Sequence, residues 1–580
     1  MLDNLLSYFG NLSIILSIFS SFFLGRATTF SLFSSLLSVL ALMIAFASDC
    51  FKISLVAGHS NELLPIHYKL FALWGSHEGS MLIWSLVLIF LAFLFQRFYY
   101  SSEDDKKIKE FTIVIQLLLF VLFQLFILFE ANPFLLNNNY ITSDLSPILQ
   151  DKALFIHPPL LYIGYIGTSI IFSYSIAMLF CGNNRLHDKQ MQNWYKGIWM
   201  MLTVGILLGS LWSYREIGWG GFWFWDPIEN ISLLPWLSLL ILLHTKNNII
   251  KISAGISTFL FAILGTFLNR SNIITSIHSF ANNNSQILKY YIIGIFFCSI
   301  VVYLLKIKKF AMSNITRSSI FFVMNNIISL IGIIVLLLGF ILPIIGKEQK
   351  IFIDNSYYND SFFFLSIISM IAITIYNFSK IKYFHIFYLI CSTLLILLLL
   401  HDINISLFLI YLISITVVTS IYRIVTNSTK LESSLSHIGF ALMIFSIVFS
   451  GVNETEKYLA ISVGNSVNFD GYNIELNNIK ITQIDNYDNI ETIFKVNHSI
   501  TMNPAIKHYK QDDQYIAEPS IKNIMLFNDL YLVVDEITEN GLVYLHVYHK
   551  RGINLLWLSV MLIAFASVIA NFYKRIIKIF

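Results

Sequence analysis

Long apolar segments recur along almost the whole chain, and they constrain the fold more than any other feature. A helix needs about 20 predominantly apolar residues to cross roughly 30 Å of hydrocarbon. Of the 580 residues, 56% are hydrophobic and only 12% are charged, against roughly 25% charged residues in soluble domains. The chain is therefore expected to be a polytopic membrane protein.

About fifteen of these segments are long enough to predict transmembrane helices. We expect an all-α bundle over residues 1–452 and a last helix with a short cytoplasmic tail over 552–580. The predicted spans lie near 4–24, 30–48, 80–97, 111–130, 158–181, 197–214, 230–244, 251–268, 289–306, 320–344, 361–379, 384–400, 404–422, 434–452 and 552–572.

The one long polar segment, 453–551, has a different pattern. Apolar and polar residues alternate in stretches such as "YNIELNNIKITQI" and "LVYLHVYHK", and this period of two is typical of β-strands. Asp470-Gly471 and Asn540-Gly541 are residue pairs that favour hairpin turns. The pattern predicts a small β-rich domain held between the last two spans.

Basic residues predict the orientation of the helices. Lys and Arg gather in alternating loops, for example near 97–109, 306–309 and 574–578, and such loops face the cytoplasm. The other loops, and the polar segment with them, are then expected on the outer face: 49–79, 131–157, 215–230 and 269–288.

One of these outer loops, within residues 215–231, contains "WGGFWFWDPIEN". Its indoles offer walls for a flat ligand, its glycines let such a ligand approach the backbone, and its polar residues can fix the loop by hydrogen bonds. An interfacial belt of aromatic residues is the alternative explanation for the indoles. The residues proposed to bind the ligand are Trp219, Gly220, Gly221, Trp223, Trp225, Asp226 and Asn230.

Four histidines form a second signal, with one possible pair at each face of the membrane. His157 and His278 are predicted at the outer ends of spans, and His244 and His437 at the inner ends. Zinc usually takes four ligands, and no Cys or carboxylate accompanies either pair. Haem iron takes two axial ligands in an apolar, aromatic envelope, so each pair is a candidate haem site. The alternative is that each imidazole merely bonds to a neighbouring helix.

Several stretches together resemble the CcmF/NrfE family, part of the WWD haem-handling superfamily of cytochrome c maturation. The resemblance follows the family in order and covers essentially the whole chain. The stretches are "HYKLFALWGSHEGSMLIW" (67–84), "LFIHPPLLYIGYIG" (154–167), "REIGWGGFWFWDPIENISLLPWL" (215–237), "LGTFLNRSNIITSIHSFA" (264–281) and "SHIGFAL" (436–442).

The resemblance implies a haem lyase that joins haem to CxxCH motifs of apocytochrome c. His157 and His278 match the iron ligands of the substrate haem b at the WWD loop. His244 and His437 match those of a permanent, bis-His haem b within the membrane. No residue of the chain is assigned as catalytic, because substrate thiols and haem vinyl groups are the reactants. His77 and Glu78 are expected to assist haem or quinol, or to cap a loop.

The resemblance also implies a place and partners. We expect a multi-pass protein of the bacterial inner membrane, with the WWD loop and the β domain facing the periplasm. The expected partners are a haem chaperone of the CcmE type, apocytochrome c, a thiol-reducing subunit of the CcmH type and quinol, with no nucleic acid. The alternative functions are a haem export or relay protein without ligation activity, a transporter of another solute, and a scaffold.

Overall fold

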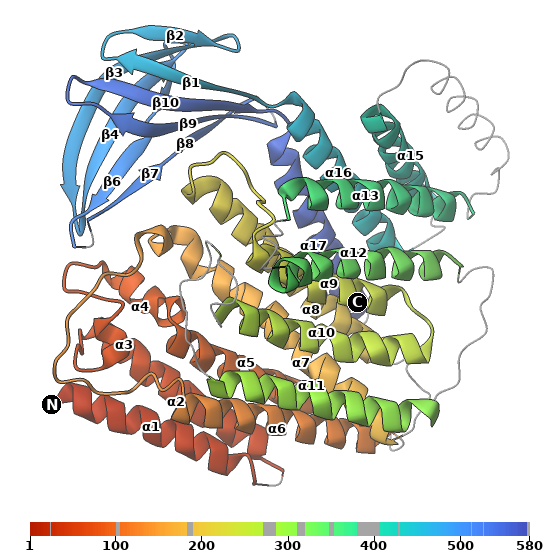
Figure 1. The fold of residues 1–580 in the computed structure, drawn as a ribbon. Coiled ribbons are helices and arrows are strands. Elements are labelled where there is room, and N and C mark those ends of the chain that lie inside the picture. Colours follow the sequence, from red (N-terminus) through yellow and green to blue (C-terminus); the bar gives the residue numbers. More distant parts are fainter. Residues whose placement is uncertain are drawn as a thin grey trace.

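The computed structural model consists of a large helical bundle and a separate β domain (Figure 1). The residues that the structure describes are 1–23, 25–99, 105–181, 189–270, 276, 286–309, 320–346, 353–379, 405–426, 430–511, 513–525 and 527–576. The predicted fold class, a helical membrane bundle with a C-terminal β-rich domain, is confirmed.

The helices follow one another with short connections. In the first half of the chain they are α1 (Leu2–Ser20), α2 (Ala27–Ala47), α3 (Ser54–Ala57), α4 (Ile66–Gly75), α5 (His77–Phe98), α6 (Lys106–Phe129), the 3-10 turns η2 (Pro147–Leu149) and η3 (Lys152–Phe155), α7 (His157–Cys181), α8 (Lys189–Glu216) and α9 (Pro227–His244). After them come α10 (Asn248–Arg270), α11 (Gln286–Lys306), η4 (Ile307–Lys309), α12 (Ile320–Ile345), α13 (Asn355–Phe378), α15 (Ile405–Val425), α16 (Leu431–Asn453) and α17 (Ile553–Ile576).

Within the described part of the chain, 12 helices are long and apolar enough to cross a membrane. Two shorter apolar helical stretches, Ile292–Lys306 and Ile553–Ile569, coincide with two more predicted spans. The predicted span 384–400 lies outside the described residues. The chain is therefore a multi-pass membrane protein, and the number of about fifteen spans stays a prediction.

Glycines allow α7 and α8 to pack closely at the centre of the bundle. A Cβ on Gly164 would lie 2.4 Å from the backbone nitrogen of Leu202, and one on Gly205 would lie 2.7 Å from the Cα of Leu161. Such small residues permit backbone contact between membrane helices, where the lipid supplies no hydrophobic drive for association. This contact fixes the start of α7, and with it His157, against α8.

The β domain contains two antiparallel sheets, with strand orders β1-β10-β9-β8 and β2-β3-β4-β6-β7. Apolar residues from both sheets form one buried cluster, for example Leu476, Phe494 and Leu545. The strands are β1 (Thr455–Ser462), β2 (Ser466–Phe469), β3 (Tyr472–Ile484), β4 (Tyr487–Val496), β5 (Ile500–Met502), β6 (Ala505–Tyr509), β7 (Gln514–Glu518), β8 (Ser520–Met525), β9 (Asn528–Ile537) and β10 (Leu542–Lys550).

The two predicted hairpin turns differ in outcome. Asp470 and Gly471 join β2 to β3 directly, and both have positive φ, 47° and 84°, as a two-residue turn of type I′ requires. Between β9 and β10 the connection is longer, because the Thr538 N–H donates to the Leu542 carbonyl. Only Gly541 of that predicted pair has positive φ.

Amide side chains tie the β domain to one end of the bundle, at the top of Figure 1. Asn61 donates to Gln511 at 2.8 Å, and Asn486 donates to Asp144 at 2.6 Å. The connections 49–65 and 131–156, the loop before α9 and the β domain therefore share one end of the bundle. The proposed bounds of the domains, 1–452, 453–551 and 552–580, stay predictions.

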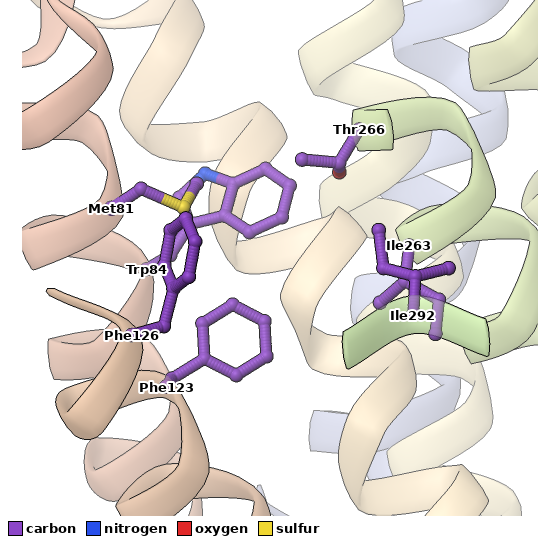
Figure 2. A pocket seen from close by; sticks show the side chains of 7 residues that line it. All are labelled: Met81, Trp84, Phe123, Phe126, Ile263, Thr266 and Ile292. Atoms are coloured by element: carbon purple, nitrogen blue, oxygen red, sulfur yellow. The ribbon is translucent and has the colours of Figure 1, made fainter. Parts of the chain in front are cut away.

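A small apolar pocket lies inside the bundle, between α5, α6, α10 and α11 (Figure 2). It encloses about 330 Å³ of empty space. In Figure 2 the aromatic rings and the methionine face Thr266 and two isoleucines across the gap. Its lining residues are Met81, Trp84, Phe123, Phe126, Ile263, Thr266 and Ile292.

Candidate functional site

The WWD loop connects α8 to α9 and is fixed by the start of α9. Asp226 is the N-cap of this helix and accepts from the Ile228 N–H at 3.1 Å, while Glu229 accepts from the Asp226 N–H at 3.0 Å. This reciprocal capping box satisfies backbone donors that a helix start leaves open. Asn230 donates to the Trp225 carbonyl at 2.8 Å. Asp226 and Asn230 thus hold the loop's backbone, and their contact with haem stays a prediction.

Trp225 is held by α13, a helix that the sequence gave no reason to place beside the loop. Its ring stacks on Tyr358 with centroids 5.2 Å apart, and its Nε1 donates to Asn359 Oδ1 at 2.7 Å. Its φ of 56° is left-handed, a conformation that costs a non-glycine residue about 1–3 kcal/mol. The surrounding contacts therefore impose this conformation on the loop.

The other two tryptophans point in different directions. Trp219 donates to Ser213 at 3.3 Å and meets the exposed ring of Phe224 edge-on. Trp223 packs edge-on against Trp225, with centroids 5.9 Å apart. The Nε1 atom of Trp223 is buried and has no hydrogen-bond partner among the described residues. A buried donor of this kind suits a polar ligand atom.

The glycines of the loop have neighbours different from those expected. A Cβ on Gly220 would lie 2.9 Å from the ring of Tyr548 in β10, and one on Gly221 would lie 2.2 Å from the ring of Trp219. Protein rings occupy the space beside both glycines. We therefore correct the reason given for them: they allow the loop to pack against the β domain and against itself. Binding of haem by Gly220 and Gly221 stays a prediction.

Two buried tyrosines of the β domain cover the loop from above. Tyr531 and Tyr548 meet edge-on with centroids 5.5 Å apart, and Tyr531 also contacts Tyr214 of α8. Burial raises the pKa of both Tyr531 and Tyr548, so both phenols are neutral near pH 7. The sequence did not indicate these residues, because the alternation in β9 and β10 does not show which surface a strand covers.

His157 begins α7 and lies in a notch of α8. Its Nδ1 is 2.9 Å from the Gly205 carbonyl, and its Cε1 would lie 2.7 Å from a Cβ on Gly209. A carbonyl only accepts, so Nδ1 is the protonated nitrogen and Nε2 has the lone pair. A second contact that fixes the tautomer is typical of imidazoles that bind metals.

His278, the expected partner of His157, lies outside the described residues. Ser276, two positions earlier, donates to Asp226 Oδ2 at 2.5 Å. The connection after α10 therefore reaches the WWD loop at the N-cap of α9. The pairing of His157 with His278 stays a prediction.

The structure brings His244 and His437 to one cluster, although 193 residues separate them in the sequence. Their imidazoles are close enough to interact electrostatically. The ring of Phe322 lies 6.4 Å from His244 and 6.5 Å from Tyr376, and Tyr376 lies 6.2 Å from His437, between centroids. Two imidazoles from α9 and α16 thus share an aromatic surround.

The nitrogen atoms of this pair fit a ligand set for iron. His244 Nδ1 is 3.0 Å from the Leu240 carbonyl, which makes Nε2 the nitrogen with the lone pair. His437 Nδ1 is buried without a hydrogen-bond partner among the described residues. In the same part of the chain, no three His, Cys, Asp or Glu residues group as metal ligands, whereas haem iron needs only two axial nitrogens.

His77 and Glu78 form the first turn of α5, and Ser76 rather than either of them is its N-cap. Ser76 accepts from the Gly79 N–H at 3.1 Å. His77 is buried and meets Phe126 edge-on, beside the apolar pocket. The capping alternative is therefore wrong for both residues, and a role toward haem or quinol stays a prediction.

The comparisons with known proteins match both parts of the chain. The family described as "Cytochrome C assembly protein" matches residues 74–276, and "CcmF C-terminal beta-sandwich" matches 452–551. The chain is 28% identical to the cytochrome c-type biogenesis protein CcmF of Pseudomonas aeruginosa, over 92% of this chain and 88% of that protein. It is 29% identical to NrfE of Haemophilus influenzae, over 93% and 91%.

A solved structure, "Cytochrome c Heme Lyase CcmF", has the same fold. It superposes with a TM-score of 0.79 at 18% identity and covers 98% of this chain and 97% of its own. Sequence and fold agree over nearly the whole length, and they give the protein a role in cytochrome c biogenesis. The chain belongs to the CcmF family of cytochrome c-type biogenesis proteins.

Proposed function

We propose that this protein is a haem lyase that promotes covalent attachment of haem to apocytochrome c at the outer face of the inner membrane. A haem chaperone of the CcmE type delivers the haem, and a subunit of the CcmH type presents the reduced apocytochrome. In the reaction, each of two cysteine thiols adds across one haem vinyl group, so that S–C and C–H bonds form and the vinyl double bond is consumed.

Helix α9 is the observation that carries this proposal. Asp226 of the WWD loop caps its start, and His244 ends it. Its 18 residues span about 27 Å, which is close to the thickness of the hydrocarbon layer. One helix thus joins a haem platform at one membrane face to an iron ligand near the other.

The residues of the outer site position the reactants. Trp219, Trp223 and Trp225 hold the flat ligand, and His157 with His278 binds its iron. Orientation of this kind contributes about 7–11 kcal/mol in ideal cases. The apocytochrome's own histidine then replaces a protein ligand as the product leaves.

The inner site has a supporting role. His244 and His437 hold a permanent haem b, which passes electrons from quinol to the outer haem and keeps its iron ferrous. The aromatic surround of Phe322 and Tyr376 excludes water from this group, because both rings lie beside the imidazoles. The bound haem supplies the electron transfer, and the chain supplies the ligands and the dry surround.

Absorption spectra of the purified protein test this assignment. We expect a low-spin b-type spectrum, oxidised and reduced with dithionite, that is lost in both His244→Ala and His437→Ala and retained in His157→Ala. A haem that survives both inner substitutions and disappears in His157→Ala contradicts the two-site assignment and favours a haem relay.

Capture of apocytochrome separates lyase from relay. Under the lyase assignment, the detergent-solubilised protein binds an apocytochrome peptide with an intact CxxCH motif more tightly than a peptide in which SxxSH replaces it. Binding of a haem chaperone alone, with no affinity for either peptide, supports the relay.

A further inference from the structure

Two cations lie beside the inner histidine cluster, each over a ring that contacts one histidine. The Lys246 ammonium lies 5.1 Å from the centroid of Phe322, which neighbours His244. The Arg423 guanidinium carbon lies 4.7 Å from the centroid of Tyr376, which neighbours His437. The cluster therefore contains two imidazoles, two rings and two cations.

Arg423 is deeply buried in α15, with 1% of its surface exposed. Its Nη1 donates to Asn377 Oδ1 of α13, and the Asn377 amide donates in turn to Thr419 and Ser420 at 3.1 and 3.0 Å. This network fixes the guanidinium between α13 and α15. A buried cation in a membrane helix is costly, and such residues commonly serve binding.

Lys246 differs from Arg423 in its exposure. It follows the end of α9 by two residues and is exposed, so its ammonium remains hydrated. The two cations lie on separate elements, α15 and the connection after α9, and only the cluster brings them together. A ligand with two separate negative groups fits this arrangement better than a single small anion, because each cation is anchored to its own ring.

We propose that Arg423 and Lys246 bind the two carboxylates of the haem held between His244 and His437; this rests on the proposed function. The planar guanidinium binds a carboxylate with two parallel hydrogen bonds, whereas the ammonium binds as a point charge. The two cations set the rotation of the haem plane between the imidazoles and favour its reduced state, because each adds positive charge beside the iron.

Redox titration of the holoprotein tests this inference. Arg423→Gln and Lys246→Gln are each expected to lower the midpoint potential of the membrane haem while the bis-His spectrum stays low-spin. A tenfold change in the redox equilibrium corresponds to 59 mV for one electron, and we expect Arg423→Gln to reach it. Arg423→Lys keeps the charge and is expected to restore most of the potential.

Lys306→Gln is the matched control. Lys306 also lies over an aromatic ring, 5.7 Å from the centroid of Phe180, at the end of another helix. Its loss is expected to leave the potential unchanged. An equal fall in Lys306→Gln and Lys246→Gln overturns the proposal, and so does an unchanged potential in Lys246→Gln. If the wild-type protein contains no bis-His haem, the proposed function itself fails.

Haem with esterified carboxylates separates direct binding from a general effect of charge. Protein from haem-deficient cells is loaded in detergent with haem or with its dimethyl ester. Wild type is expected to bind the ester at least tenfold more weakly, and Lys246→Gln is expected to lose part of that preference. Equal affinities in wild type overturn the proposal and indicate that the cations bind a lipid phosphate.

Discussion

The ring of Tyr548 lies so close to Gly220 that a Cβ at this glycine would stand 2.9 Å from three of the ring's carbons. Tyr548 belongs to β10 and Gly220 to the WWD loop, so the β domain and the membrane bundle meet at the candidate haem site. Gly220 also has a φ of 71°, a conformation that L-residues rarely adopt.

Gly220→Ala tests whether this contact supports haem attachment. The methyl group must displace the Tyr548 ring or the loop, and we expect covalent haem in a co-expressed cytochrome c to fall at least tenfold, measured by haem stain after denaturing electrophoresis. Gly464→Ala is the matched control, because Gly464 has a φ of 85° with no neighbour within 4 Å. Equal losses in both variants attribute the effect to backbone strain alone.

Gly209→Ala tests the notch that holds His157. The new methyl group would lie 2.7 Å from the His157 ring, so it displaces the imidazole without removing it. Haem attachment is expected to fall, while the absorption spectrum of the membrane haem stays as in wild type. Gly167→Ala, on the same α7–α8 contact but against Ile198 at 3.2 Å, is expected to retain attachment. A normal Gly209→Ala protein argues against His157 as a ligand.

Asp226→Ala removes the N-cap of α9. Loss of such a cap costs about 0.5–2 kcal/mol, and here it also releases the Ser276 contact. We expect faster hydrogen exchange in the first turn of α9 and in the WWD loop. Asp226→Asn keeps an acceptor at the cap and is expected to exchange at nearly the wild-type rate. Equal exchange in all three proteins contradicts this role of Asp226.

A cluster at the base of the β domain predicts a dependence of stability on pH. A hydrogen bond from His549 holds the pKa of Asp470 below its usual value, against the opposing effect of burial, and Thr455 and Arg551 also donate to this carboxylate. Asp470 therefore stabilises the folded state above its unfolded pKa of about 3.9, and this contribution is lost as the pH falls through the lower, folded value.

Asp470→Asn measures that contribution. At pH 7 we expect it to destabilise the domain by about 1.5–3 kcal/mol, the range for hydrogen bonds to charged groups, as seen in denaturant unfolding of the intact protein followed by hydrogen exchange in β1 and β10. The difference from wild type should shrink below pH 4. Asp485→Asn, in the exposed turn between β3 and β4, is expected to show neither effect.

The sequence predicted what local periodicity and spacing determine. Runs of apolar residues marked the helices, alternation marked the β domain, and Asp470-Gly471 marked a turn, because each depends on neighbours along the chain. Asp226 and Asn230 were expected to hold the WWD loop for the same reason. The resemblance supplied the pairing of His244 with His437, which spacing alone does not determine.

Contacts across the fold were beyond the sequence. Nothing local placed Tyr358 and Asn359 against Trp225, or Tyr548 against Gly220, because these residues meet only through the packing of distant elements. The two rings that carry Lys246 and Arg423 belong to α12 and α13, and neither helix contains a histidine in its described part. The glycines were consequently assigned to haem contact, although protein rings adjoin them.

The attachment of the β domain to the bundle has a kinematic consequence. The chain enters the domain after Asn453 and leaves it before Ile553, and Arg551 donates to the Asn453 carbonyl at 2.7 Å while Ser446 donates to that of Gly552 at 2.7 Å. Two adjacent attachment points form a hinge with one main axis. The amide pairs Asn61–Gln511 and Asn486–Asp144 act as latches at the far edge. Swinging the domain away from the WWD loop therefore breaks a few neutral hydrogen bonds and no covalent or ionic link at that edge.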